Sequence, residues 1–497
     1  MIHIKLYFFT AIFGIFILMP IAMGYSEEKH IELSLRDCID RALKENLNFK
    51  SAALGLKMNE LSVVQQESIF DPGISLQVGR SETNRPNFAS YIPVNSIESE
   101  TTNLNLQYGQ KLWTGADWGA GFTSILSESN IETEKNYLSY FGINFTQPLL
   151  KGFGKKVNES GIYTARLNGQ ITELEIEDNA ASLVYEVESI YWNLIYARET
   201  LKVLELAVDQ ADSLLAYNST ACELGLRTES DVLEAKSALI NREQDVLDQE
   251  KLVCDLEDKL KRLLNISTGT DGPVRVIPTD SPEVIQVELD WEQILNDALR
   301  YHPDYQASKT AVEKNELQAA VAKNSLLPDL NLITSYKING SGETVGDNFS
   351  DIGSGDTYGW EVSLNLSFPV GSNYAEAAYE KSKIDVKRSQ LSVEDLEQRI
   401  STEIQTAIRN VEVNREKVDV MTLSVEINEL KLEKEEERYR NNLSTSFFVL
   451  EYQKDLMNAR NLYNKALMDY TMAVEELKLI SGTLLKDINI SIIGIKS

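Results

Sequence analysis

The chain has 497 residues, more than one compact core needs and ordinary for a protein of two or three domains. It is acidic, because 76 Asp and Glu residues against 48 Lys and Arg residues give a formal charge of -28. This charge excludes nucleic acid as a partner, since a phosphate backbone attracts proteins that carry positive charge. An acidic protein that handles solutes is expected to favour cations or to be indifferent to charge.

The N-terminus has the pattern of a signal peptide. Lys5 precedes an apolar run over 6–23, and Ala22 and Gly24 are the small residues that a cut after Gly24 requires, so we expect residues 1–24 to be removed. An uncleaved anchor is the alternative, because the run is near the minimum length of a spanning helix. The residue directly after the cut is not Cys, so lipid attachment there is not expected. No later segment is apolar enough for a membrane helix. The mature chain is therefore expected to be periplasmic, released, or inserted as a β-barrel.

An internal repeat organises the rest of the chain. Segments 33–72 and 289–328 share residues at a constant offset, including the final Pro72 and Pro328. We predict a first repeat over 25–266, a linker rich in Thr, Gly, Asp and Pro over 267–288, a second repeat over 289–482 and a C-terminal tail over 483–497. The predicted elements are helix 33–70, strands within 73–148, long helix 158–220, turn 221–227 and helix 228–264, then helix 290–327, strands within 329–369, long helix 373–441, turn 441–444 and helix 445–480.

The predicted strands alternate apolar residues with Thr, Ser, Asn and Gln, and aromatic residues gather near their ends. Transmembrane β-strands have this pattern, but a β-sandwich explains the alternation equally well. The long polar connections 81–101 and 340–356 favour a barrel, whose outer loops are long. We predict two strands in the second repeat and four in the first, at about 73–82, 102–112, 117–127 and 138–147, and whether all four join the barrel stays open. One chain supplies fewer strands than the roughly eight of the smallest barrels, so subunits must share the barrel.

Both long helices carry apolar residues at alternating steps of four and three, over 176–215 and 400–439. A strict repeat of 3.5 residues is a coiled-coil seam, since a straight helix would drift off it. Asn218 interrupts the first seam, and Glu435 occupies a position of the second. A helix over 158–218 would be ~90 Å long at 1.5 Å per residue, far longer than a globular core requires. We therefore expect helical hairpins that pack against neighbours.

The residues with reactive side chains indicate no active site. Cys38, Cys222 and Cys254 have no metal-ligand spacing, and we interpret all three as unpaired small apolar residues. His30 and His302 have no Cys, His or paired carboxylates at ligand spacing nearby. The sequence lacks the G-x-S-x-G, P-loop and H-E-x-x-H motifs, so we expect no catalytic residues, no cofactor and no metal.

Four motifs follow one another in a fixed order. They are the two entry helices from Leu33 and Leu289, the strand-to-helix junction 147–154, and the hairpin turns 225–233 and 442–450. In order, spacing and duplication they resemble the TolC-like outer membrane efflux protein family (outer membrane factors) over nearly the whole mature chain. The resemblance implies an α+β membrane protein built from a tandem repeat. In its homotrimer, a transmembrane β-barrel in the cell outer membrane continues into a long α-helical coiled-coil barrel in the periplasm.

The resemblance also implies a gate and docking turns at the hairpin tips. By position, Asp231 and Tyr439 keep the Asp and Tyr that hold the family's channel closed, whereas Ser444 replaces the Arg, for which Arg227 is a candidate substitute. One of the family's two acidic ring positions is Phe448 here. The gate candidates are Asp231, Glu234, Tyr439, Glu451 and Arg227. The candidate adaptor-docking residues are Gly225, Leu226, Thr228, Asn442, Leu443 and Thr445. For the acidic side chains a solvated helix face is the alternative.

These features lead us to expect the outer-membrane subunit of a tripartite efflux or type I secretion system, a passive export duct and not an enzyme. The implied partners are a periplasmic adaptor (membrane fusion) protein, an inner-membrane transporter or ABC exporter, and outer-membrane lipid. Small molecules are the preferred cargo, with polypeptides and metal ions left open. The alternative is a secreted, non-conducting coiled-coil scaffold or adhesin, which explains the heptads and the signal peptide but not the duplicated strands.

Overall fold

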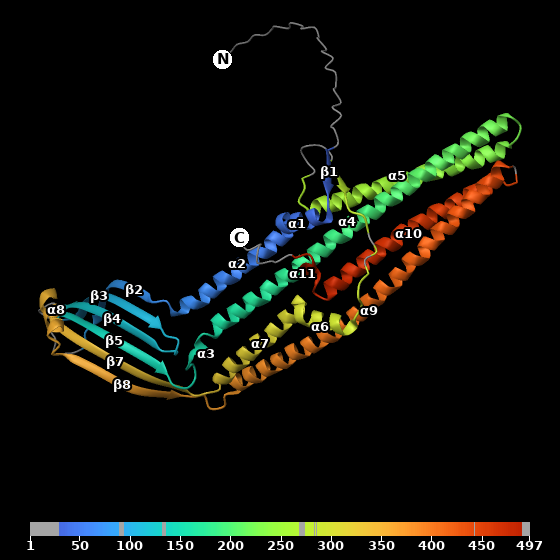
Figure 1. Cartoon of the computed structure of the whole chain (residues 1–497). Coiled ribbons are helices and arrows are strands. Elements are labelled where there is room, and N and C mark those ends of the chain that lie inside the picture. The colour runs from blue at the N-terminus through green and yellow to red at the C-terminus, as the bar shows by residue number, and fades with distance from the viewer. Residues whose placement is uncertain are drawn as a thin grey trace, which may run out of the picture.

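The computed structural model describes residues 29–88, 94–131, 136–267, 274–282, 284, 286–441 and 443–489. The predicted signal peptide 1–24 and the turn residue Asn442 lie outside the described residues. Figure 1 shows an elongated molecule with a β-sheet at one end and two long helical hairpins that reach the other end. Within the described ranges, no helix combines the length and the apolar character that a membrane span requires.

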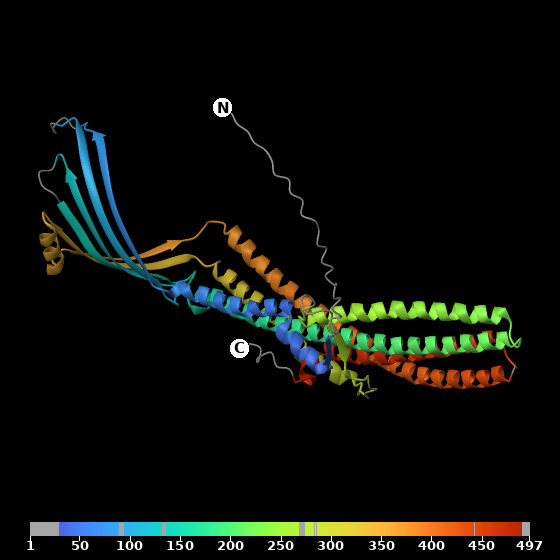
Figure 2. The same cartoon turned by 90° about the horizontal axis from the view of Figure 1, so that it is seen from above.

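Six antiparallel strands form the sheet, in the order β2-β3-β4-β5-β7-β8. The strands are β2 (Gly73–Pro86), β3 (Ser96–Lys111), β4 (Asp117–Ser129), β5 (Asn136–Pro148), β7 (Asp329–Gly342) and β8 (Tyr358–Ser367). All four first-repeat strands therefore belong to the sheet. β5 pairs with β7 from Tyr137 opposite Gly342 to Pro148 opposite Asn331, which joins the two repeats. Among the described residues β2 and β8 each pair with one strand only, so they are the edges of a sheet that is visibly curved (Figure 2).

The pairing register gives the sheet one apolar face and one polar face. The row Val78, Leu104, Ser124, Ser139 and Gly340 runs across five strands and shows which residues share a face. The apolar face, which holds this row, also carries Ile74, Leu76, Leu106, Phe122, Phe141, Ile143, Tyr336, Ile338, Trp360, Val362 and Leu364. The polar face carries Gln77, Asn103, Asn105, Thr123, Asn144, Ser335, Asn339, Glu361, Ser363 and Asn365. The two faces therefore require different surroundings, apolar on one side and aqueous on the other.

Both entry helices are broken, so the prediction of one uninterrupted helix over 33–70 and another over 290–327 is wrong. In the first, α1 (Leu35–Glu45) and α2 (Leu47–Glu67) meet at Asn46, whose backbone is extended. The Asn46 side chain accepts a hydrogen bond from the Phe49 amide and donates one to the Leu263 carbonyl, so it caps α2 and fixes the bend.

The second entry helix breaks at the equivalent place. α6 (Trp291–Tyr301) and α7 (Pro303–Asn324) meet at His302, which is extended. Pro303 disfavours a helical conformation for the residue before it and is itself well suited to the first position of a helix. Different residues thus produce the same bend in the two repeats.

The two hairpins are coiled pairs of long helices. Their members are α4 (Ser160–Glu223) and α5 (Glu229–Leu263) in the first repeat, and α9 (Asn373–Arg440) and α10 (Ser446–Ile480) in the second. With 64 residues α4 is ~95 Å long at 1.5 Å per residue, and α9 has 68 residues. The heptad positions predicted from the sequence lie in the core, as Val187 and Leu194 on α4 and Ile400 and Ile404 on α9 illustrate with exposures of 0%. With 35 residues each, α5 and α10 pair with only part of α4 and α9, and the remaining parts of the two long helices pack on α2 and α7.

Midway along the molecule a small parallel β-pair crosses the helices. It joins β1 (Lys29–Leu33) to β6 (Val274–Pro278), which lies within the predicted linker. The buried hydroxyl of Tyr191 on α4 lies 2.6 Å from Asp280 Oδ2 just beyond β6 and 3.0 Å from the Leu33 carbonyl oxygen at the end of β1. A further short helix, α11 (Leu484–Asp487), covers this core from the predicted tail. The linker and the tail are thus partly structured.

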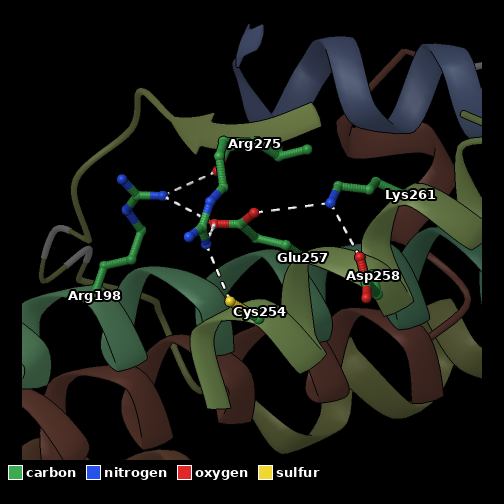
Figure 3. A network of polar contacts seen from close by, with 7 residues as sticks. Arg198, Cys254, Glu257, Asp258, Lys261 and Arg275 are labelled. Atoms are coloured by element: carbon green, nitrogen blue, oxygen red, sulfur yellow. Dashed lines mark hydrogen bonds and ion pairs between the residues drawn. The ribbon is translucent and has the colours of Figure 1, made fainter. Parts of the chain in front are cut away.

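A buried ion cluster holds β6 on the first hairpin (Figure 3). Glu257 of α5 is 1% exposed, and its Oε1 lies 3.4 Å from Arg198 Nη1 of α4 and 3.7 Å from Arg275 Nη1 of β6. Its Oε2 lies 3.9 Å from Lys261 Nζ, which also pairs with Asp258. Because a buried carboxylate is costly without positive partners, the cluster fixes three elements relative to one another.

Candidate functional site at the hairpin tips

The two hairpin turns lie next to each other at the end of the molecule farthest from the sheet (Figure 1). In the first turn Gly225 adopts a left-handed conformation with φ 73°, which only glycine adopts without strain. Its amide donates to the Cys222 carbonyl, and the amide of Leu226 donates to the carbonyl of Ala221, so α4 ends in a glycine cap. The predicted docking residues Gly225 and Leu226 therefore shape the turn.

The second half of this turn is a capping box that starts α5. The Thr228 hydroxyl oxygen accepts from the Asp231 amide at 3.2 Å, and Asp231 Oδ2 accepts from the Thr228 amide at 3.0 Å. Partial burial raises the pKa of the Asp231 carboxyl, but the hydrogen bonds from Thr228, with help from Ser446 and Arg227, leave its pKa below the usual value. Asp231 is therefore an ionised cap residue, which sets its position whatever else it does.

A buried polar network joins the four long helices at this level. The Tyr439 hydroxyl of α9 donates to Asn218 Oδ1 of α4 at 2.6 Å and lies 2.8 Å from Ser446 Oγ of α10. Asn218 Nδ2 donates to Ser446 Oγ at 2.9 Å and to the carbonyl of Asp231 on α5 at 3.1 Å. Asn218 and Ser446 are fully buried, and Tyr439 is 4% exposed. The hydrogen bonds thus tie the two hairpins of one protomer together.

Arg227 lies against this network from the first turn. Its guanidinium carbon is 4.2 Å from the centroid of the Tyr439 ring, and its Nη2 donates to the Tyr439 carbonyl at 3.3 Å. Ser444, which stands where the family has Arg, instead donates to Glu435 Oε1. Glu435 also pairs with Arg438 and is only 4% exposed, so this member of the acidic run on α9 is not solvated. The structure brings together Arg227, Asp231 and Tyr439 of the predicted gate residues.

The other predicted residues that the structure describes are exposed. The side chains of Glu234 on α5 and Glu451 on α10 are exposed to solvent. Leu226 and Leu443 are 70% and 68% exposed, and Thr228 and Thr445, at the N-caps of α5 and α10, are exposed too. The exposed apolar side chains at the tips are Leu224, Leu226, Leu233, Leu443, Phe447 and Phe448.

Sequence reasoning missed the centre of the network. In the sequence Asn218 is only an interruption of the heptad pattern, and no pattern marks Ser446. A polar residue at a core position of a coiled coil is a recognised signal for a specific partner. Its partners here come from three other helices, so the interruption alone does not identify them.

A curved sheet with one apolar and one polar face, continued by hairpins of this length, defines a class of channel subunits that combine β-barrel strands with a helical tube. The chain belongs to the outer membrane efflux protein family, whose model matches residues 38–265 and 294–483. No curated protein matches the chain.

Solved channel structures resemble this one over most of their length. The CmeC outer membrane channel of Campylobacter jejuni has a TM-score of 0.67 at 15% identity, over 90% of this chain and 86% of that one. The open state of the MtrE outer membrane channel of Neisseria gonorrhoeae has a TM-score of 0.64 at 16% identity, over 90% of this chain and 89% of that one. The outer membrane protein VceC of Vibrio cholerae has a TM-score of 0.64 at 15% identity, over 90% of this chain and 96% of that one. The likeness confirms the predicted fold, barrel strands followed by a helical barrel in a tandem repeat.

Proposed function

We propose that the chain is the subunit of a passive outer-membrane channel in a tripartite efflux or type I secretion system. It would receive small molecules from a periplasmic adaptor and an inner-membrane pump and release them outside, without hydrolysing anything itself. The observation that carries the proposal is that strands of the sheet continue directly into the long helices. β5 leads through the junction 149–159 into α4, and β8 leads through 368–372 into α9.

The sheet has the dimensions of a membrane barrel wall. On β8 the apolar face extends from Tyr358 to Leu366, close to the roughly 9–11 residues of a transmembrane β-strand. The apolar face would contact lipid and the polar face would line the water-filled lumen. On this view the sheet lies in the outer membrane and the helices extend into the periplasm.

A homotrimer would close the barrel. The edge strand β2 leads away from the helices and the edge strand β8 leads back towards them, so β8 of one protomer can pair antiparallel with β2 of the next. With six strands from each of three copies the barrel would have eighteen, an even number as antiparallel closure requires. Barrels of about this size enclose an aqueous channel.

Cell fractionation distinguishes the channel from the secreted scaffold or adhesin. We expect the protein in the outer-membrane fraction, as trimers that dissociate only when the sample is heated before electrophoresis. Recovery of the protein in the soluble periplasm, or of monomers alone from the membrane, would favour the non-conducting scaffold.

We propose that the tips dock onto the adaptor through their exposed leucines. Leu226 and Leu443 project from adjacent turns whose backbones are held by caps, so they present apolar surface with little loss of conformational entropy on binding. Leu226→Asp combined with Leu443→Asp should abolish co-purification with the adaptor while trimers still assemble. Ser230→Asp adds a charge at the same tip without removing apolar surface and should retain binding. Undiminished co-purification by the double variant would contradict this role.

We also propose that the tips form the periplasmic gate. Arg227, Asp231 and Tyr439 would hold the hairpins closed, and the exposed Glu234 and Glu451 would line the opening in a threefold ring. Like charges in such a ring repel, so protonation or divalent cations should favour narrowing. Glu451→Gln and Asp231→Asn, which keeps the helix cap, should each change the conductance or the cation preference in planar bilayers. If both properties stay unchanged in both variants, these carboxylates have no part in a gate.

A further inference from the structure

A short helix in the connection between β7 and β8 packs onto the sheet near the end that lies away from the long helices (Figures 1 and 2). This helix, α8 (Val345–Ser354), begins at Thr344, whose side chain accepts from the Asp347 amide, and ends at Gly355 with φ 69°. The sequence suggested only a long polar connection there. Defined caps at both ends make α8 a folded element of the barrel rim.

Small residues of the sheet make room for α8. Gly340, Ser139 and Ser124 are neighbours in one row across β7, β5 and β4. A Cβ atom on Gly340 would lie 2.5 Å from the Asn348 carbonyl oxygen and 2.6 Å from Ile352 Cγ1, so only glycine fits beneath the helix. Large apolar residues occupy most other positions of the same face, so this row is a notch that receives α8.

Specific contacts seat the helix in the notch. Asn348 Nδ2 donates to Ser139 Oγ at 2.9 Å, and Ser139 Oγ donates to Ser124 Oγ at 2.7 Å. Asn348 and Ser139 are 2% and 4% exposed, so the Asn348 Nδ2 group and the Ser139 hydroxyl are paired away from solvent, whereas Asn348 Oδ1 has no hydrogen-bond partner among the described residues. The Phe349 ring stacks on that of Phe122 of β4, with centroids 5.6 Å apart and planes at 15°. Both residues that α8 contacts in this way, Ser139 and Phe122, belong to the apolar face.

One side of α8, which includes the part of Phe349 that the sheet leaves uncovered, is exposed and continues the apolar face. Val345 and Phe349, four residues apart and hence on one side of the helix, are 51% and 55% exposed. The helix has no Lys or Arg. Its acidic groups are engaged towards the loops, since Asp347 Oδ2 accepts from the Thr344 hydroxyl and Asp351 Oδ2 accepts from the Ser341 amide.

We infer that α8 is an interfacial helix on the outside of the barrel, with Val345 and Phe349 in contact with the outer leaflet at the boundary between headgroups and acyl chains. The inference rests on the proposed membrane barrel. The lumen is not the site, because α8 lies on the apolar face and the lumen side is the polar face. The neighbouring protomer is not the occupant, because α8 packs on β5 and β7 and reaches Phe122 on β4, away from the β8 edge. Helices with one apolar side bind membranes at this depth.

Lipid quenching of a fluorescent label tests the assignment. In a chain with Cys38, Cys222 and Cys254 changed to alanine, Val345→Cys would be labelled with an environment-sensitive dye and the trimer placed in phosphatidylcholine vesicles that contain nitroxide lipids. We expect blue-shifted emission that headgroup-level nitroxides quench more than deep ones. Two matched labels serve as controls. A label at Val362→Cys on the apolar face should be quenched mainly by deep nitroxides. A label at Asn365→Cys on the polar face should not be quenched by nitroxides at either depth.

The controls separate two kinds of failure. Water-like, unquenched emission at position 345 with normal quenching at 362 would overturn the interfacial helix and leave the barrel intact. Absence of quenching at 362 as well would overturn the barrel itself. If the cysteine-free chain does not fold, benzoylphenylalanine in place of Phe349 in the otherwise natural chain should crosslink to lipid on illumination of whole membranes. The same group in place of Asn365 should not, and equal crosslinking at both positions, or none at 349, would contradict the inference.

Discussion

The Tyr439 hydroxyl donates a 2.6 Å hydrogen bond to Asn218 Oδ1, a contact between two side chains 221 residues apart in the sequence. Tyr439 lies in the last turn of the long helix of the second repeat, and Asn218 lies near the end of the long helix of the first. Both are buried, and both also contact Ser446. A polar network within one chain therefore joins the tips of the two hairpins.

Removing the Tyr439 hydroxyl should loosen the tip. Tyr439→Phe leaves Asn218 and Ser446 buried with fewer partners, which costs about 1–3 kcal/mol. We expect faster amide hydrogen exchange in the last turns of α4 and α9 and a larger or noisier single-channel conductance. Tyr217→Phe is the matched control, since Tyr217 packs 5.8 Å from the Tyr439 ring but is 44% exposed. Equal exchange rates in the two variants would show that the network does not hold the tip.

Arg227 should take the role of the Arg that Ser444 replaces in this chain. Arg227→Gln removes the cation from the Tyr439 ring, an interaction of about 0.5–2 kcal/mol, while it keeps a hydrogen-bond donor. We expect a rise in open probability in planar bilayers. Arg440→Gln removes an exposed Arg that pairs with Glu436 on the same helix and should leave the open probability unchanged. A channel that is indifferent to both changes would exclude Arg227 from the gate.

Glu188 should make the stability of the protein depend on pH. This residue of α4 is 2% exposed, and burial, together with nearby Glu475, raises the pKa of its carboxyl from 4.5 to about 8, while Lys478 lowers it. Between pH 4.5 and about 8 the folded protein keeps a proton on Glu188 that the unfolded chain has released. The free energy of unfolding is therefore highest below about pH 4.5 and falls as the pH rises to about 8. The slope is at most about 1.4 kcal/mol per pH unit.

Glu188→Gln stays uncharged at every pH and should flatten this dependence. Denaturant unfolding of detergent-solubilised protein between pH 5 and 9 measures it. We expect the variant to gain stability over the natural chain as the pH rises. Parallel curves for the two proteins would mean that Glu188 titrates normally.

The ion cluster around Glu257 should stabilise the middle of the molecule. Glu257→Ala removes the carboxylate that Arg198, Arg275 and Lys261 share. Because Arg198 and Arg275 are 31% and 36% exposed and Lys261 keeps its pair with Asp258, we expect a loss of about 1–3 kcal/mol. Glu199→Ala breaks only an exposed pair with Lys202 on the same helix and should cost less than about 1 kcal/mol. Thermal unfolding of both variants tests the contrast, which would fail if their midpoints coincided.

Periodic patterns predicted the large features of the fold. Alternation located the strands, and steps of three and four located residues such as Val187 and Ile404, which lie in the core. Local patterns could not reveal contacts between distant segments. The bend at Asn46 depends on the carbonyl of Leu263, and the β1–β6 pair joins residues about 245 positions apart, as Lys29 opposite Val274 shows. The tip network was hidden for the same reason, since Asn218 finds its partners on three other helices.

Single-channel recording from the purified trimer in a planar lipid bilayer tests the central claim most directly. The proposed eighteen-stranded barrel with a polar inner face predicts discrete conductance steps that favour cations, as expected for a chain with a formal charge of -28. Tyr439→Phe should raise the conductance or open probability. A trimer that inserts into the bilayer but passes no current, both as the natural chain and as this variant, would contradict a channel.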